Sequence, residues 1–182
     1  MFERPSGLMP PRSRGKGALA IACAGLALVS GAVAGPAIAQ NYAYARTGAN
    51  EPGACAAGKG PAVMVEVRGL KSAEGNLFVR AYPARKSDWL KSKRYLIRID
   101  AAPRTGKVDV CVPLPAPGAY AIAVQHDVNG NRSTDISTDG AGMSNNPGFK
   151  TFLGIPRPPS VESVRFDAGS GVTRMTIRMV YL

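Results

Sequence analysis

The chain has 182 residues and a formal net charge of +11, with one His and three Cys. This excess of basic residues favours anionic partners. Lys and Arg occur singly rather than in a basic run, and there is no basic helix or set of stacking aromatics, so nucleic acid is not an expected partner. One His and widely spaced Cys also lack the spacing of a zinc site.

Residues 1–39 have the pattern of a secretory signal peptide. Basic residues lie between positions 12 and 16, an apolar run covers 18–34, and Ala37-Ile38-Ala39 forms an A-x-A cleavage site. A retained membrane anchor is the alternative, but the apolar run is shorter than the ~20 residues that a spanning helix needs. We therefore expect a periplasmic or secreted protein, with no transmembrane segment after cleavage.

Cleavage before Gln40 would leave 143 residues, enough for one domain that buries about two-thirds of its surface on folding. Four of the 23 Lys and Arg and one of the 12 Asp and Glu precede Gln40, so the mature net charge would be +8. Residues 40–60 are rich in Ala, Gly and Asn without periodicity, and we expect a flexible leader there. Residues 61–182 are expected to form the folded domain.

Two cysteines, Cys55 and Cys111, remain after cleavage. An exported protein meets an oxidising compartment, where an even pair of cysteines indicates a disulfide. We predict that this bond ties the leader to the domain.

Most of the domain alternates apolar and polar residues with the period of a half-buried strand. Strands are predicted over 62–70, 77–82, 95–99, 107–112, 119–125, 161–166 and 172–181. Val63, Val65 and Val67 share one face of the first, and Met175 and Ile177 lie on the apolar face of the last. Seven short strands with Gly and Pro turns predict an antiparallel Ig-like or transthyretin-like β-sandwich with one long ordered loop.

Residues 84–94 interrupt this pattern. Ser87 to Leu90 is expected to form one helical turn capped by Ser87. We expect Trp89, the single tryptophan, to close one end of the core, because aromatic side chains dominate core burial. An exposed stacking platform is the alternative.

Several motifs resemble known families. The run Leu114-Pro-Ala-Pro-Gly-Ala-Tyr120, followed by an alternating strand, is similar to the L-x-P-G-x-Y strand of transthyretin-like and carboxypeptidase-regulatory-like sandwiches. The pieces HDVNGN from His126 and MSNNP from Met143, with the early Cys and the alternating run from Gly60, resemble the bacterial "domain of unknown function" family 2141. This resemblance implies an exported sandwich and assigns no activity.

The segment after the predicted strand 119–125 is a polar loop with oxygen-bearing side chains at near-even spacing. Asp127, Asn129 and Asn131 occupy alternate positions and Asp135 follows. Calcium takes about six to eight oxygen ligands, and alternate positions in a tight loop converge on one point. These four residues are the candidate metal ligands, and calcium is the one candidate cofactor.

The same residues can also fold a long connection without a metal, because Asp and Asn side chains bond the backbone two residues on. Arg132 stands where a helix–loop–helix calcium loop needs Gly, and Thr138 stands where it needs a bidentate Glu. The metal-free interpretation is therefore favoured, and we expect no obligatory cofactor.

His126 is the single histidine and lies next to Asp127. A catalytic triad would also need a nucleophile and an oxyanion hole, and Ser133, Ser144 and Ser160 have no motif that supports such a role. We expect His126 to donate to a carbonyl or carboxylate at its strand end.

No catalytic constellation emerges from the sequence, and no catalytic residue is assigned. The favoured interpretation is a non-enzymatic exported module with a binding or structural role, and its partner is expected to be an anionic component of the cell envelope. A calcium-stabilised binding module that uses loop 127–139 and a small hydrolase centred on His126 are the alternatives.

Overall fold

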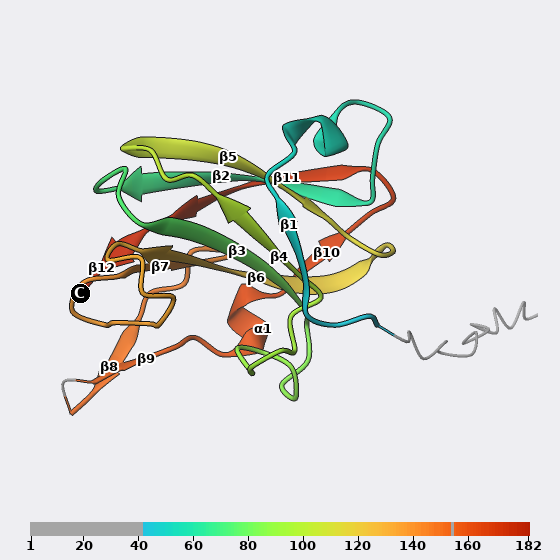
Figure 1. Cartoon of the computed structure of the whole chain (residues 1–182). Helices are drawn as coiled ribbons and strands as arrows, with labels where there is room; N and C mark the ends of the chain where they lie inside the picture. Colours follow the sequence, from blue (N-terminus) through green and yellow to red (C-terminus); the bar gives the residue numbers. More distant parts are fainter. Residues whose placement is uncertain (1–41, 154) are drawn as a thin grey trace, which may run out of the picture. The chain divides into compact units, whose positions relative to one another are not determined.

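The computed structural model describes residues 42–153 and 155–182, which belong to one compact unit. The predicted signal peptide, 1–39, lies outside the described residues. Nearly all of the unit's regular secondary structure is β-strand (Figure 1). The larger sheet contains β1 (Arg46–Ala49), β3 (Asn76–Pro83), β4 (Ile97–Ala101), β6 (Gly118–Asp127), β7 (Gly140–Met143), β10 (Phe166–Ala168) and β12 (Val180–Tyr181).

A second sheet has three strands in the order β11-β2-β5, namely β11 (Val172–Arg178), β2 (Ala62–Leu70) and β5 (Gly106–Pro113). The chain passes from β11 in this sheet to β12 in the larger one through a single residue, Met179. A separate hairpin pairs β8 (Lys150–Phe152) with β9 (Ile155–Arg157). Two short helices complete the unit: η1, a 3-10 helix (Pro52–Cys55), and α1 (Val161–Val164).

The core lies between the two sheets. It is formed by the apolar residues of the predicted apolar–polar alternation along the strands. Val63, Val65 and Val67 of β2 are fully buried against the larger sheet's inner residues, as predicted. On β11, Ile177 is also fully buried, which confirms the predicted apolar face of the last strand. The all-β sandwich is therefore confirmed. Within 42–153 and 155–182, no helix is long and apolar enough to cross a membrane.

The sheets are mixed rather than purely antiparallel, which corrects that part of the prediction. β1 runs parallel to β4, and β11 runs parallel to β2. The leader predicted over 40–60 therefore contains two short elements, β1 and η1. Its composition gave no periodic signal because the side chains of β1 are mostly exposed, and the strand is held by backbone pairing with Ile97 to Asp100.

The strand predicted over 161–166 is wrong. Val161 and Val164 are spaced three apart and are both buried, which places them on the same face of a single helical turn. This turn is α1, and the strand β10 begins only at Phe166. The residues of the helical turn expected at 87–90 lie in a hydrogen-bonded turn over 86–90, in which the Trp89 N–H donates to the Arg85 carbonyl at 2.9 Å.

A second, smaller apolar cluster covers part of the opposite face of the larger sheet. Trp89 is 8% exposed and packs edge-on against Tyr82, with ring centroids 5.3 Å apart. Its indole N–H donates to the Pro159 carbonyl at 2.9 Å. The cluster also contains Val161 and Val164 of α1. Trp89 is buried, as expected, but it seals this outer face rather than an end of the main core.

Candidate binding cleft

A cleft of about 620 Å³ opens on the outer face of the larger sheet, beside the cluster that contains Trp89. Its floor consists of outward-facing residues of β3, β6 and β7, including Arg80, Ala123 and Ala141. The two alanines leave space above the sheet because their side chains are short. The segments 90–93 and 132–136 supply walls. The volume lies within the range of about 300–1,000 Å³ that is usual for small-molecule sites.

The lining of the cleft is mainly apolar, with a surplus of positive charge. Tyr82, Tyr95, Met143 and Phe149 contribute apolar surface. The charged lining residues are four cations and two acids, namely Arg80, Lys91, Lys93, Arg132, Asp135 and Asp139. An apolar pocket with a few cationic groups suits a ligand that has an apolar body and a negative group.

Arg80 is the cation on the cleft floor. It is half-buried, and its Nη1 donates to the Gln125 side-chain oxygen at 3.0 Å. Its guanidinium carbon lies 5.3 Å from the centre of the Phe78 ring. Burial is the main reason why the pKa of the Arg80 guanidinium is lowered. Within the described part of the chain, Arg80 forms no ion pair.

Arg98, which lies opposite Arg80 on β4, differs from Arg80 in having an acidic partner. Arg98 is paired across the strands with Arg80 and also stacks on Phe78, at 4.9 Å. However, both oxygens of Asp100 accept from Arg98, at 2.6 and 2.9 Å. Arg98 is thus neutralised by an acid of its own strand, whereas Arg80 presents its charge to the cleft.

The wall at 132–136 belongs to the polar loop, and Asp139 closes that loop. Asp139 is 7% exposed, and its carboxylate accepts from the backbone N–H of Val128 at 3.2 Å and of Asp135 at 3.1 Å. Gln125 donates to the same carboxylate at 3.3 Å and to the Ser133 carbonyl. Sequence reasoning missed this role, because no local pattern predicts that the Asp139 side chain binds the backbone at positions 128 and 135.

Three of the four predicted metal ligands converge. The side-chain amides of Asn129 and Asn131 donate to Asp135 Oδ2, at 3.0 and 2.7 Å. These two hydrogen bonds lower the pKa of the Asp135 carboxyl. Each Asn oxygen also accepts from the backbone N–H two residues on, at Asn131 and Ser133. The side-chain-to-backbone bonds expected for a metal-free fold of this loop are therefore present.

Asp127, the fourth predicted ligand, is fully buried at the end of β6. Its Oδ2 accepts from the Arg132 N–H at 2.9 Å and from the Asn76 side chain at 3.1 Å. Its Oδ1 is enclosed and has no hydrogen-bond partner in the part of the chain that the structure describes. In that same part, no group of three His, Cys, Asp or Glu side chains is placed to hold a metal ion.

His126 is fully buried and both of its ring nitrogens are engaged. Nε2 lies 2.9 Å from the Glu74 carbonyl, which can only accept, so Nε2 carries a proton. Nδ1 lies 2.6 Å from the Tyr181 hydroxyl, which donates to it in the neutral imidazole. The predicted donation to a carbonyl is confirmed. Among the described residues, no hydrogen bond joins His126 to a serine.

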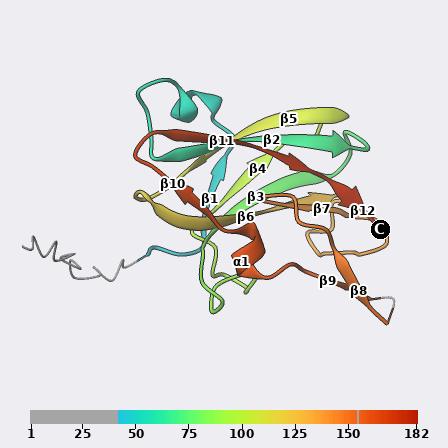
Figure 2. The same ribbon diagram turned by 180° about the vertical axis from the view of Figure 1, so that it is seen from behind.

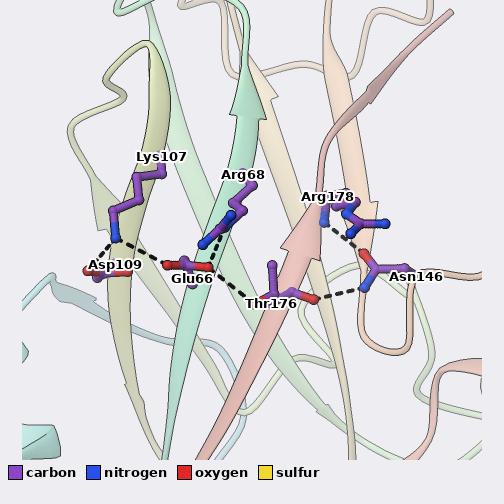
Figure 3. Close-up of polar contacts among 7 residues, drawn as sticks. All are labelled: Glu66, Arg68, Lys107, Asp109, Asn146, Thr176 and Arg178. Carbon is purple, nitrogen blue, oxygen red and sulfur yellow. Dashed lines mark hydrogen bonds and ion pairs between the residues drawn. The ribbon is translucent and has the colours of Figure 1, made fainter.

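The motif Ser144-Asn145-Asn146 joins three parts of the fold. Ser144 is fully buried, and its hydroxyl accepts from Ile122 N–H of β6 at 3.0 Å and donates to the Val164 carbonyl of α1. Asn145 and Asn146 adopt left-handed backbone conformations, with φ of 63° and 49°, which Asn tolerates well. The Asn146 side chain binds β11 through the Thr176 carbonyl and the Arg178 N–H, at 2.8 and 2.7 Å (Figure 3).

A second cluster of polar side chains lies on the small sheet, and the sequence analysis did not predict it. Glu66 of β2 accepts from Arg68, from Lys107 at 3.1 Å and from the Thr176 hydroxyl at 3.2 Å (Figure 3). The hydrogen bonds from Arg68 and then Lys107 lower the pKa of Glu66 to about 2. These residues form a surface network across β5, β2 and β11. Within it, the Glu66 carboxylate already accepts hydrogen bonds from Arg68, Lys107 and Thr176.

The disulfide predicted between Cys55 and Cys111 is present, with a Cα–Cα distance of 5.7 Å. It connects η1 to β5, and both cysteines are buried. The early segment is thus attached to the small sheet, whereas the cleft is built on the large one.

Comparison with known proteins identifies one family. A family model described as "Uncharacterized protein conserved in bacteria (DUF2141)" matches residues 65–176, which include the cleft floor, the polar loop and the Ser144-Asn145-Asn146 motif. No curated protein and no solved structure matches the chain. The chain therefore belongs to the DUF2141 family, as its motifs predicted.

Proposed function

We propose that this protein is an exported, non-enzymatic binding module whose cleft holds an anionic amphiphile of the cell envelope. The observation that carries this proposal is Arg80, a half-buried cation without an acidic partner among the described residues, on the floor of a mainly apolar cleft. A negative head group would pair with the guanidinium, and an alkyl or aromatic body would cover the apolar lining.

The compartment in this proposal rests on the sequence of residues 1–39, which predicts export to the periplasm or beyond. The net charge of +8 after cleavage would favour approach to anionic lipids or polymers. The non-enzymatic part is supported by the enclosure of His126, whose two nitrogens serve a backbone carbonyl and a tyrosine hydroxyl. The hydrolase alternative gains no support from this arrangement.

Calorimetric titration with dodecanoate below its micellar concentration tests the proposal. We expect binding of dodecanoate and no comparable binding of uncharged dodecyl maltoside. Replacing Arg80 by Gln should weaken dodecanoate binding by about ten- to a hundredfold, the range for a lost hydrogen bond to a charged group. Arg98→Gln is the matched control, because Arg98 lies opposite on β4 but faces Asp100. Equal affinity in both variants would contradict the proposal.

A second candidate function, a calcium-stabilised loop, is favoured by Asp127. Its Oδ1 is enclosed without a partner, and a buried carboxylate oxygen is costly to leave unpaired. A calcium ion would satisfy it, with oxygens of Asn129, Asn131 and Asp135 as the other side-chain ligands. Only two of the four are carboxylates, so we expect the weak affinity of extracellular calcium modules, with a Kd of roughly 10⁻⁴–10⁻³ M.

Thermal unfolding with calcium and with chelator tests this candidate. At ten times Kd, binding to the folded state should raise Tm by about 3–6 °C. Asp135→Asn should abolish the shift while leaving the fold intact, because Asp135 is not buried. Asp167→Asn, an exposed acid outside the loop, is the control and should retain the shift. An unchanged Tm in calcium would remove this candidate and leave the cleft proposal untouched.

A further inference from the structure

The β8–β9 hairpin carries large apolar side chains that remain mostly exposed to solvent. Phe152 is 57% exposed, Leu153 is 87% exposed and Ile155 is 63% exposed. Both views draw β8 and β9 extending away from the two sheets (Figures 1 and 2). Single exposed apolar residues are ordinary, but three grouped at the end of one hairpin mark an interaction surface.

The charges around these residues have one sign. Lys150 and Arg157 lie directly opposite each other across the hairpin, and neither forms an ion pair with a described residue. The Arg157 guanidinium lies 4.6 Å from the centre of the Phe152 ring. The sequence has no Asp or Glu between Asp139 and Glu162. Two cations directly opposite on a hairpin repel each other, and an anionic surface would relieve that repulsion.

We propose that the β8–β9 hairpin docks the protein on an anionic membrane surface. Phe152, Leu153 and Ile155 would enter the boundary between head groups and acyl chains, while Lys150 and Arg157 would remain among the phosphates. Apolar contact and basic charge both contribute to such interfacial binding. A protein groove of opposite charge is the competing occupant, and vesicle binding distinguishes it from a membrane.

Docking through the hairpin does not require a ligand in the cleft. The two features are nevertheless neighbours, because Pro156 of the hairpin and Pro158 after it line the cleft. A docked hairpin would therefore hold the cleft close to the membrane surface.

Flotation with vesicles tests the proposal. We expect the purified protein to float with vesicles of phosphatidylcholine and phosphatidylglycerol, and not with phosphatidylcholine alone. The double variant Phe152→Ser, Leu153→Ser should bind at least about tenfold more weakly, because it removes two apolar side chains from the inserted tip. Both positions are exposed, so its Tm should equal that of the wild type.

A charge-matched pair of variants isolates the role of position. Lys150→Glu with Arg157→Glu should abolish flotation. Lys59→Glu with Arg104→Glu changes the net charge by the same amount at exposed positions outside the hairpin. This control variant should retain most of the flotation with anionic vesicles. The proposal would be overturned if the Phe152→Ser, Leu153→Ser variant floated as well as the wild type. It would also be overturned if the two charge variants lost flotation to the same extent.

A fluorescence measurement reports insertion itself. In Leu153→Trp, the emission maximum should shift to shorter wavelength on addition of anionic vesicles, whereas Lys59→Trp should show no shift. Trp89 is buried in the fold and contributes a constant background. Absence of a shift at position 153, or absence of flotation altogether, would overturn membrane docking and favour a protein occupant. Dodecanoate binding in the cleft should persist in the serine variant, so the two proposals can fail separately.

Discussion

Asn50 and Asn146 bind the two opposite edges of the small sheet in the same way. The Asn50 side chain donates to the Asp109 carbonyl at 2.9 Å and accepts from the Cys111 N–H at 3.0 Å on β5. The Asn146 side chain does the same with Thr176 and Arg178 on β11. Each amide thus replaces one peptide of a missing neighbouring strand. A sheet edge with free N–H and C=O groups invites pairing with another chain, and these side chains block it.

We therefore predict that Asn146→Ala increases self-association. Asn146 is exposed, so water can replace its hydrogen bonds, but Ala tolerates the left-handed backbone conformation at this position less well than Asn. The unfolding free energy should therefore fall by about 2 kcal/mol. Static light scattering at increasing protein concentration should detect the association, and urea unfolding the stability. Asn131→Ala, in the polar loop, is the matched control. Equal association in the two variants would show that Asn146 does not protect the edge.

The Glu66 network predicts a stability difference that depends on pH. The folded pKa of Glu66 is lowered from 4.5 to about 2, so its contribution is fully present above about pH 4.5 and is lost as pH falls through about 2. Glu66→Gln should lower the unfolding free energy at neutral pH, and the difference from wild type should close towards pH 2. Urea unfolding from pH 7 to pH 2 measures this directly.

Glu51→Gln serves as the control for that series, because Glu51 is exposed and forms no ion pair with the described residues. Its curve should follow the wild type at every pH. A Glu66→Gln difference that stays constant across the pH range would mean that the carboxylate charge is not the cause.

The disulfide closes a loop with a sequence separation of 56. Chain entropy predicts that its removal, in Cys55→Ala with Cys111→Ala, lowers the unfolding free energy by about 4 kcal/mol. Chemical denaturation of the wild type under reducing conditions should give a loss of similar size, which controls for the two substituted side chains. Unfolding midpoints that do not respond to reductant would contradict this assignment.

The strands were predictable where one face is buried and the period is therefore visible. Val63, Val65 and Val67 illustrate this, since alternate residues must face the core. β1 could not be found in this way, because it is held by backbone pairing with β4 and leaves most side chains in solvent. Val161 and Val164 were assigned to the wrong period because a four-residue helix offers a single apolar interval.

The candidate site also contains residues that could be predicted from the sequence and residues that could not. Asn129, Asn131 and Asp135 were identified from local spacing, and the structure does bring their side chains together. Arg80 was predicted only as part of the strand over 77–82. Arg80 lines a cleft because segments 90–93 and 132–136 lie over β3 and β6. That arrangement depends on tertiary contacts, which local sequence patterns do not predict.

The central claim is that the cleft over β3, β6 and β7 is the binding site. The most direct measurement is a titration of isotope-labelled protein with dodecanoate, followed by amide chemical-shift mapping. The account predicts that the largest shifts fall at Arg80, Ala123, Gln125 and segment 132–136, and that Arg80→Gln suppresses them. Saturable shifts confined to the small sheet, or no shifts at all, would contradict it.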